Sequence, residues 1–202
     1  MPIPFTKRSI GTRRLLNLAL LWSLSLMLIV SFVVTAESQS RDSGSRFEKD
    51  GLGFDYSSLW ELSDQSNPAA QQLVLMEKAL DAQIMIIALR SPITNAKQEE
   101  QAKTGLIEPS ISRLLKQYED AGIKVERVPM KIDVNGVSAD GVQLRFAIDG
   151  QQGTTDTLWL MINHRLVQLF FIRAEKTAPK ATECWDMVRS TLQITKPTKT
   201  KQ

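Results

Sequence analysis

The feature that most limits what this chain can form is an uncharged stretch of 22 residues, Leu15 to Ala36. A helix of that length reaches about 33 Å, and the hydrocarbon core of a bilayer is about 30 Å thick. Every charged residue before the stretch is basic: Lys7, Arg8, Arg13 and Arg14. Because basic residues mark the cytoplasmic end of a membrane segment, we predict a single-pass helix with the N-terminus inside and the rest of the chain outside.

A cleaved signal peptide is the alternative interpretation of the same stretch. Val34-Thr35-Ala36 offers a small residue for cleavage between Ala36 and Glu37, which would release a secreted or periplasmic protein. The apolar part of a signal peptide usually runs only about 7 to 15 residues, which favours an uncleaved anchor in the cytoplasmic membrane. Both interpretations place the remainder of the chain outside the cytoplasm.

The charge of the exported part argues against a nucleic-acid partner. The whole chain has 25 Lys and Arg against 22 Asp and Glu, but four of the basic residues precede the uncharged stretch. The remainder is therefore close to neutral and has no excess of basic residues to attract phosphates. The single cysteine, Cys184, excludes an internal disulfide, so a hydrophobic core has to hold the fold.

Composition divides the chain into five parts. Residues 1–14 form a basic cytoplasmic segment and residues 15–36 the transmembrane helix or signal peptide. Residues 37–50 are short, polar and rich in serine and charge, which is typical of a linker. Residues 51–195 are long enough for one globular domain, and residues 196–202 are a basic tail.

The globular part alternates in a way that predicts strands. Gly51–Tyr56 places Leu52, Phe54 and Tyr56 on one face and reads as a first strand. Leu73–Met76 and Ala82–Leu89 are apolar on both faces, which predicts central strands covered on both sides. Val142, Leu144, Phe146 and Ile148 alternate with polar residues, as in a half-exposed strand.

Turns and helices complete the predicted order of elements. Asn135-Gly136 is a strong hairpin signal, Asn163-His164 predicts a second turn, and a flexible turn is expected over 149–153. Pro109–Ala121 has an apolar stripe at helical spacing, and Pro179–Leu192 has another. The expected fold class is α/β of the α+β type, an antiparallel sheet sandwiched by helices after the N-terminal transmembrane helix.

The chain resembles the PsbP-like superfamily, which also contains the Ran-binding Mog proteins and the periplasmic DcrB lipoproteins. The residues that carry the resemblance are Gly53-Phe54-Asp55-Tyr56 with Trp60, Asp133-Val134-Asn135-Gly136, and Arg189-Ser190-Thr191-Leu192. It covers roughly residues 47 to 195, although family members often have a proline where this chain has Ser57-Ser58. The resemblance implies the fold just described and an accessory, assembly or binding role, because the superfamily has no shared catalytic apparatus.

Three tryptophans are candidates for lining a ligand pocket between sheet and helix: Trp60, Trp159 and Trp185. Core packing is the competing role for such large side chains. His164 and Cys184 form a conceivable hydrolase dyad, although His164 falls in a predicted turn and Cys184 beside an apolar helical stripe. Asp133, Asn135 and Asp140 lack the full spacing of a calcium loop, so the sequence predicts no metal site. It predicts no catalytic or cofactor site either.

These observations favour a membrane-anchored binding or accessory domain without enzymatic activity on the outer face of a bacterial-type cytoplasmic membrane. Its expected partner is another membrane or exported protein, because a short linker keeps the domain near the bilayer. Two alternatives stay open. One is an exported domain that binds a small ligand or lipid, and the other is a hydrolase that uses Cys184 and His164.

Overall fold

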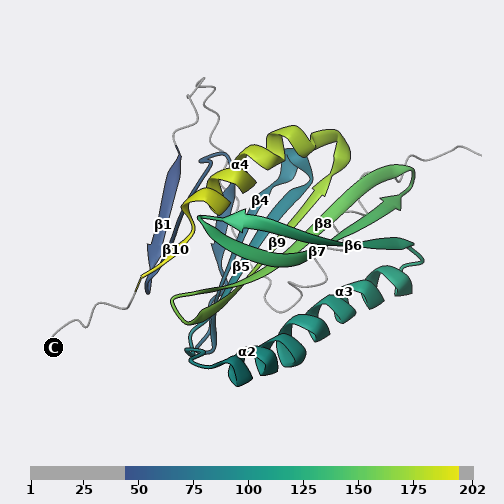
Figure 1. The fold of residues 1–202 in the computed structure, drawn as a ribbon. Helices are drawn as coiled ribbons and strands as arrows, with labels where there is room; N and C mark the ends of the chain where they lie inside the picture. Colours follow the sequence, from purple (N-terminus) through teal and green to yellow (C-terminus); the bar gives the residue numbers. More distant parts are fainter. Residues whose placement is uncertain (1–43, 196–202) are drawn as a thin grey trace, which may run out of the picture.

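The computed structural model describes residues 44–195, which fold around a seven-stranded antiparallel sheet (Figure 1). The strand order across the sheet is β3-β4-β5-β9-β8-β7-β6, and consecutive strands in the chain are neighbours except where β9 pairs with β5. The strands are β3 (Glu61–Asp64), β4 (Ala70–Glu77), β5 (Ala82–Leu89), β6 (Val125–Val134), β7 (Val137–Ile148), β8 (Gln151–Ile162) and β9 (Arg165–Ala174).

Helices lie on both faces of this sheet, which confirms the predicted α+β class (Figure 1). Helix α4 (Ala178–Thr191) covers one face. On the other face, α2 (Ala96–Ala102), the π-helical turn η2 (Lys103–Ile107) and α3 (Glu108–Asp120) follow one another without a break. Two short 3-10 turns complete the order: η1 (Lys78–Leu80) connects β4 to β5, and η3 (Glu175–Thr177) connects β9 to α4.

A second sheet of three strands, β1 (Ser45–Lys49), β2 (Leu52–Tyr56) and β10 (Gln193–Ile194), joins the two ends of the described chain. Strand β2 confirms the predicted first strand. Strand β1 lies inside the segment 37–50 that the sequence indicated as a linker, so that boundary is wrong. The sequence of β1 is mostly polar, but its Phe47 stacks on Phe54 of β2 with ring centroids 5.3 Å apart, and the backbone of Ser45–Lys49 pairs with β2.

Two apolar clusters form the core, one on each face of the large sheet. Alternate residues of β5 and β9 pack with Trp185, Cys184 and Val188 of α4 in the first cluster. Val142, Leu144, Phe146 and Ile148 of β7 pack with Ile111 and Tyr118 of α3 in the second. The predicted alternation of β7 and the predicted stripe of α3 are therefore confirmed.

Strand β5 departs from the prediction that both its faces are covered. Ile84, Ile86 and Ala88 are fully buried against the α4 layer, but the alternate residues Met85 and Ile87 are only half-buried. The α2–η2–α3 layer leaves this part of the sheet partly open, and a groove lies there.

The hairpin turns follow the predicted chemistry. Asn135-Gly136, Asp149-Gly150 and Asn163-His164 all have positive φ at both positions, which two-residue hairpin turns require. The turn that was expected over 149–153 is shorter than predicted, because β8 already begins at Gln151.

Within residues 44–195, no helix has both the length and the apolar composition needed to cross a membrane. The predicted transmembrane segment 15–36 and the basic tail 196–202 lie outside the described residues.

Candidate ligand-binding groove

The π-helical turn η2 shapes one wall of the groove. The backbone N–H of Glu108 donates to the carbonyl of Lys103, five residues earlier, where an α-helix would use a four-residue step. In this turn Leu106 is 47% exposed, whereas the next side chain, Ile107, is 1% exposed and belongs to the core. The turn therefore presents an apolar side chain at the surface beside the open part of the sheet.

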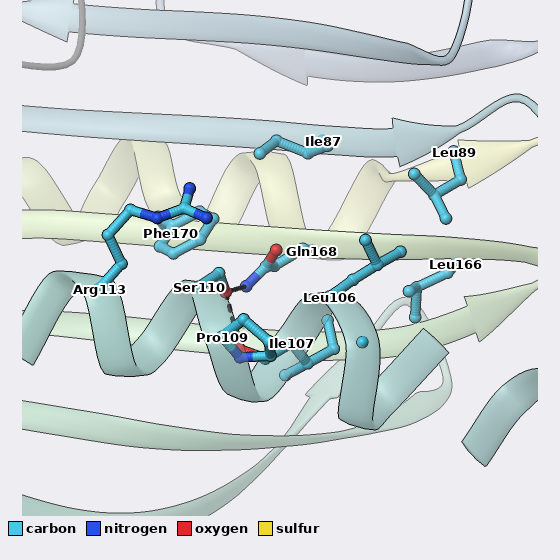
Figure 2. A pocket seen from close by; sticks show the side chains of 11 residues that line it. Ile87, Leu89, Leu106, Ile107, Pro109, Ser110, Arg113, Leu166, Gln168 and Phe170 are labelled. Atoms are coloured by element: carbon cyan, nitrogen blue, oxygen red, sulfur yellow. Dashed lines mark hydrogen bonds between the residues drawn. The ribbon is translucent and has the colours of Figure 1, made fainter. Parts of the chain in front are cut away.

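The groove runs between this wall and the strands β5 and β9, as Figure 2 shows. Its cavity volume is about 230 Å³. It is lined by Ile87 and Leu89 of β5, Leu166, Gln168 and Phe170 of β9, and Gly105, Leu106, Ile107, Pro109, Ser110 and Arg113 of the helical layer. Most of these side chains are apolar, and among the described residues that line the groove Arg113 is the one ionisable group.

Polar groups occupy the middle and one end of the groove. The Gln168 amide Nε2 donates to Ser110 Oγ over 2.8 Å, and the Ser110 hydroxyl donates to the carbonyl of Ile107 over 2.8 Å. These bonds fix the N-terminal turn of α3 to strand β9. Figure 2 shows Arg113 beside Phe170 at one end, and Leu106, Leu166 and Leu89 at the other. The groove thus has a cationic end and an apolar end.

A polar network supports the apolar end. Arg165 Nε donates to the carbonyl of Leu89 over 2.6 Å, and its Nη2 donates to Gln71 Oε1 over 2.6 Å. The fully buried Gln71 donates in turn to the carbonyl of Lys49 over 2.8 Å. Burial lowers the pKa of Arg165, and the nearby charge of Arg90 adds to this shift. A guanidinium remains protonated even so, and its donors link β9 to β4 and β5, while Gln71 extends the link to β1.

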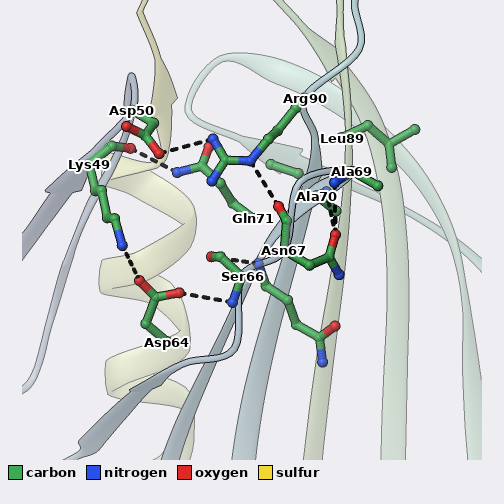
Figure 3. A network of polar contacts seen from close by, with 12 residues as sticks. Lys49, Asp50, Asp64, Ser66, Asn67, Ala69, Ala70, Gln71, Leu89 and Arg90 are labelled. Atoms are coloured by element: carbon green, nitrogen blue, oxygen red, sulfur yellow. Dashed lines mark hydrogen bonds and ion pairs between the residues drawn. The ribbon is translucent and has the colours of Figure 1, made fainter.

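Ion pairs extend this network toward the small sheet, as Figure 3 shows. Arg90 lies 2.9 Å from Asp50, and Lys49 lies 2.7 Å from Asp64. The hydrogen bond from Lys49, together with the backbone N–H of Ser66, lowers the pKa of Asp64 to about 2. The network therefore ties the β1–β2 turn to the large sheet next to the groove.

The three predicted pocket tryptophans do not meet in this groove. Trp60 and Trp185 are buried in the cluster under α4, where Trp185 stacks on Phe171 at 5.0 Å. Trp159 is half-buried on the opposite face, against the α3 cluster. The groove is therefore a different site from the tryptophan-lined pocket that the sequence predicts.

The structure does not bring His164 and Cys184 together. Cys184 is 1% exposed in the cluster beneath α4, and His164 is an exposed turn residue that lines a small cavity with α2. His164 has positive φ, in agreement with the predicted turn. Between residues 44 and 195, no group of three or more His, Cys, Asp or Glu side chains is arranged to hold a metal ion.

Sequence reasoning missed the groove residues. Gly105 and Leu106 follow a polar stretch and precede a clear amphipathic helix, so they read as a connection between elements. The one sequence signal for the groove was an apolar residue, Leu106, next to a glycine in such a connection. It could not show that Leu106 lies opposite Leu166 and Leu89, because that arrangement depends on how the helical layer crosses the sheet.

The described chain is an α+β domain in which an antiparallel sheet lies between helical layers. A solved structure of PsbP from the cyanobacterium Synechocystis is similar, with 16% identity, a TM-score of 0.48, and coverage of 81% of this chain and 99% of that chain. LpqN from Mycobacterium tuberculosis, described as involved in cell envelope biogenesis, is 12% identical with a TM-score of 0.38, over 76% of this chain and 86% of that chain. A protein from Bacteroides thetaiotaomicron is 12% identical with a TM-score of 0.45, over 75% of this chain and 48% of that chain.

No protein-family model matches the sequence, and neither does any curated protein sequence. At these identities and TM-scores, the likeness says nothing about what this chain binds.

Proposed function

We propose that the chain is a membrane-anchored, non-enzymatic binding or accessory domain held at the outer face of the cytoplasmic membrane. The observation that carries this proposal is the spacing between the uncharged segment and the first strand. Residues 37–44 alone separate Ala36 from the start of β1 at Ser45, eight residues in place of the fourteen that the sequence indicated. Fully extended, eight residues span at most about 29 Å.

Such a short connection favours partners that are themselves at the membrane. A domain confined near the bilayer meets membrane-bound partners at a raised effective concentration, so modest contacts suffice for association. The resemblance to the PsbP-like superfamily belongs to the same proposal, since it implies an accessory or binding role.

Alkaline carbonate extraction of membranes that contain the full chain tests the anchor. We expect the protein to stay in the membrane pellet with an intact N-terminus. A soluble product that begins at Glu37 would overturn the anchored form and leave a secreted or periplasmic domain. Pull-down from solubilised membranes then tests the partner, and we expect an exported or membrane protein to be recovered at a defined ratio.

Binding of a small ligand is the second candidate function, and the groove beside η2 favours it. The groove lies between sheet and helix, is mainly apolar, and has a few polar groups at defined places. That combination is typical of ligand sites in proteins.

A further inference from the structure

We propose that the groove between η2–α3 and strands β5 and β9 binds one aliphatic chain that ends in a carboxylate, with the carboxylate at Arg113 and the chain toward Leu106. The proposal rests on the binding function proposed above and names the class of its ligand. It commits to a free monomeric acid as the source, and the acyl chain of a bilayer lipid is an outcome of the test.

The order of charged and apolar groups along the groove determines the orientation of the proposed ligand. Arg113 and Leu106 are seven residues apart on one helical stretch, which corresponds to about 10 Å along its axis. Leu89 and Leu166 offer apolar surface at the Leu106 end, where no ionisable side chain lines the described groove, and Ile87 lies in the middle, opposite Gln168. A ligand that is charged at one end and apolar along its length matches this order.

Charge selects the head group. The one ionisable side chain that lines the groove is a guanidinium, whose five N–H donors in a planar fork suit the two oxygens of a carboxylate. Five donors also allow Arg113 to take a ligand oxygen in addition to contacts within the protein. A cationic head group would meet repulsion here, and an alcohol would gain only a neutral hydrogen bond.

Size selects a single slender chain. The cavity volume of about 230 Å³ is below the roughly 300–1,000 Å³ of pockets for drug-sized ligands. Two acyl chains with a glycerol head group would exceed it, whereas one medium-length chain would not. The half-buried Ile87 and the exposed Leu106 would then be shielded from water by the ligand.

Photo-labelling of the full chain in its membrane tests the proposal. The probe is a decanoate analogue that carries a diazirine in its chain, and mass spectrometry maps the labelled residues. We expect labels on η2, β5 and β9. Unlabelled decanoate should compete with the probe. Octanoate should compete about fifteenfold less well than decanoate, because it lacks two methylenes and each buried methylene changes affinity about fourfold. Decanol and decyltrimethylammonium should compete at least tenfold less well than decanoate.

Two variants and a matched control sharpen the test. Gly105 lines the groove, and a Cβ added there meets nothing within 4 Å, so Gly105→Leu should obstruct the groove and lower labelling at least tenfold without a loss of thermal stability. Arg113→Gln should abolish the preference for decanoate over decanol. Arg145→Gln removes an exposed arginine from another cavity and should change neither property.

Three results would overturn the proposal. They are undiminished labelling of Gly105→Leu, equal competition by decanoate and decanol in the unaltered protein, and stronger groove labelling by a diazirine-bearing phosphatidylglycerol than by the free acid. Carbonate extraction distinguishes failure of the ligand proposal from failure of the membrane-anchor proposal. A protein that stays in the membrane pellet but takes no label supports the anchor and overturns the ligand. A soluble protein that takes the label supports the ligand and overturns the anchor.

Discussion

Asp64 joins β3 to the β1–β2 turn through a contact that depends on its charge. Its carboxylate lies 2.7 Å from Lys49 and accepts from the backbone N–H of Ser66, and these bonds lower its pKa from 3.8 to about 2. A carboxyl whose pKa is depressed by folding stabilises the folded state above its unfolded pKa. This stabilisation is lost as the pH falls from about 4 to about 2.

We therefore expect Asp64→Asn to lower the free energy of unfolding above pH 4 and to make no difference near pH 2. The loss should stay below about 1 kcal/mol, because the pair is partly exposed and screened by solvent. Urea unfolding at several pH values, followed by tryptophan fluorescence, measures it. Glu119→Gln on the exposed face of α3 is the control and should show no such convergence. A constant difference between Asp64→Asn and the unaltered protein from pH 2 to 6 would contradict the assignment.

Tyr118 and Thr155 form a buried hydroxyl pair between α3 and β8. The two oxygens are 3.0 Å apart, Thr155 is fully buried, and Tyr118 is 4% exposed. Burial raises the pKa of Tyr118 to about 12, and the hydrogen bond with Thr155 opposes this shift only in part. The ring also packs against Phe146, with centroids 4.7 Å apart, so the hydroxyl is held inside the second cluster.

A double-mutant cycle tests this pair. Tyr118→Phe and Thr155→Val should each lower the free energy of unfolding by about 1–3 kcal/mol, because each leaves the other hydroxyl buried without its partner. The double variant should cost less than the sum of the two. Since folding raises the pKa of Tyr118, the unaltered protein should also lose stability above about pH 10, and Tyr118→Phe should lose less. Additive effects would show that the two hydroxyls are not coupled.

At the scale of the elements, β1 belongs to the fold although its sequence is polar. Its Phe47 stacks on Phe54, its Lys49 pairs with Asp64, and the carbonyl of Lys49 accepts from the buried amide of Gln71. A protein that begins at Gly51, the start expected from the sequence, loses all three contacts. It should have a free energy of unfolding at least about 2 kcal/mol lower than one that begins at Gly44, chiefly because the Nε2 of Gln71 loses its acceptor and Phe54 is uncovered.

Urea unfolding of the two shortened proteins measures this difference. Phe47→Ala in the longer protein is the control for the stacking contact alone, and it should lower the free energy of unfolding by only part of this difference. Equal stability of the proteins beginning at residues 44 and 51 would show that β1 adds nothing to the fold.

The elements that the sequence predicted correctly are those whose signals are local. Alternation in Val142–Ile148, the Asn135-Gly136 turn and the stripe from Ile111 to Tyr118 depend on neighbours within a few residues, and the structure confirms them. Strands β1 and β10 have no such signal. They form because β2 offers backbone partners on both of its edges, which becomes apparent only once the chain has folded.

The groove was unpredictable for a related reason. Whether Ile87 is covered depends on how far the α2–η2–α3 layer reaches across the sheet, and its apolar strand sequence suggested full cover. The π-helical turn that exposes Leu106 has no sequence signature of its own. Periodicity located the strands and the helix that border the site, but it could not locate the gap between them.

At the scale of the whole molecule, the N-terminal end of the described chain lies on the small sheet, away from α3 (Figure 1). If residues 15–36 anchor the protein, the small sheet is tethered within about 29 Å of the bilayer, whereas α3 and the groove are attached through the body of the domain.

Energy transfer from the protein to acceptor-labelled lipids tests this arrangement. Donors are attached at Glu48→Cys on β1 and at Glu119→Cys on α3, both exposed positions, and the buried Cys184 should not react. We expect more efficient transfer from position 48, because a linker of eight residues restricts β1 more than α3. Inserting about twenty Gly and Ser residues after Ser40 should lower both efficiencies and narrow the difference, since a flexible chain of that length no longer holds either face near the lipid. Equal efficiencies before the insertion, or a higher one from position 119, would contradict the tethered orientation.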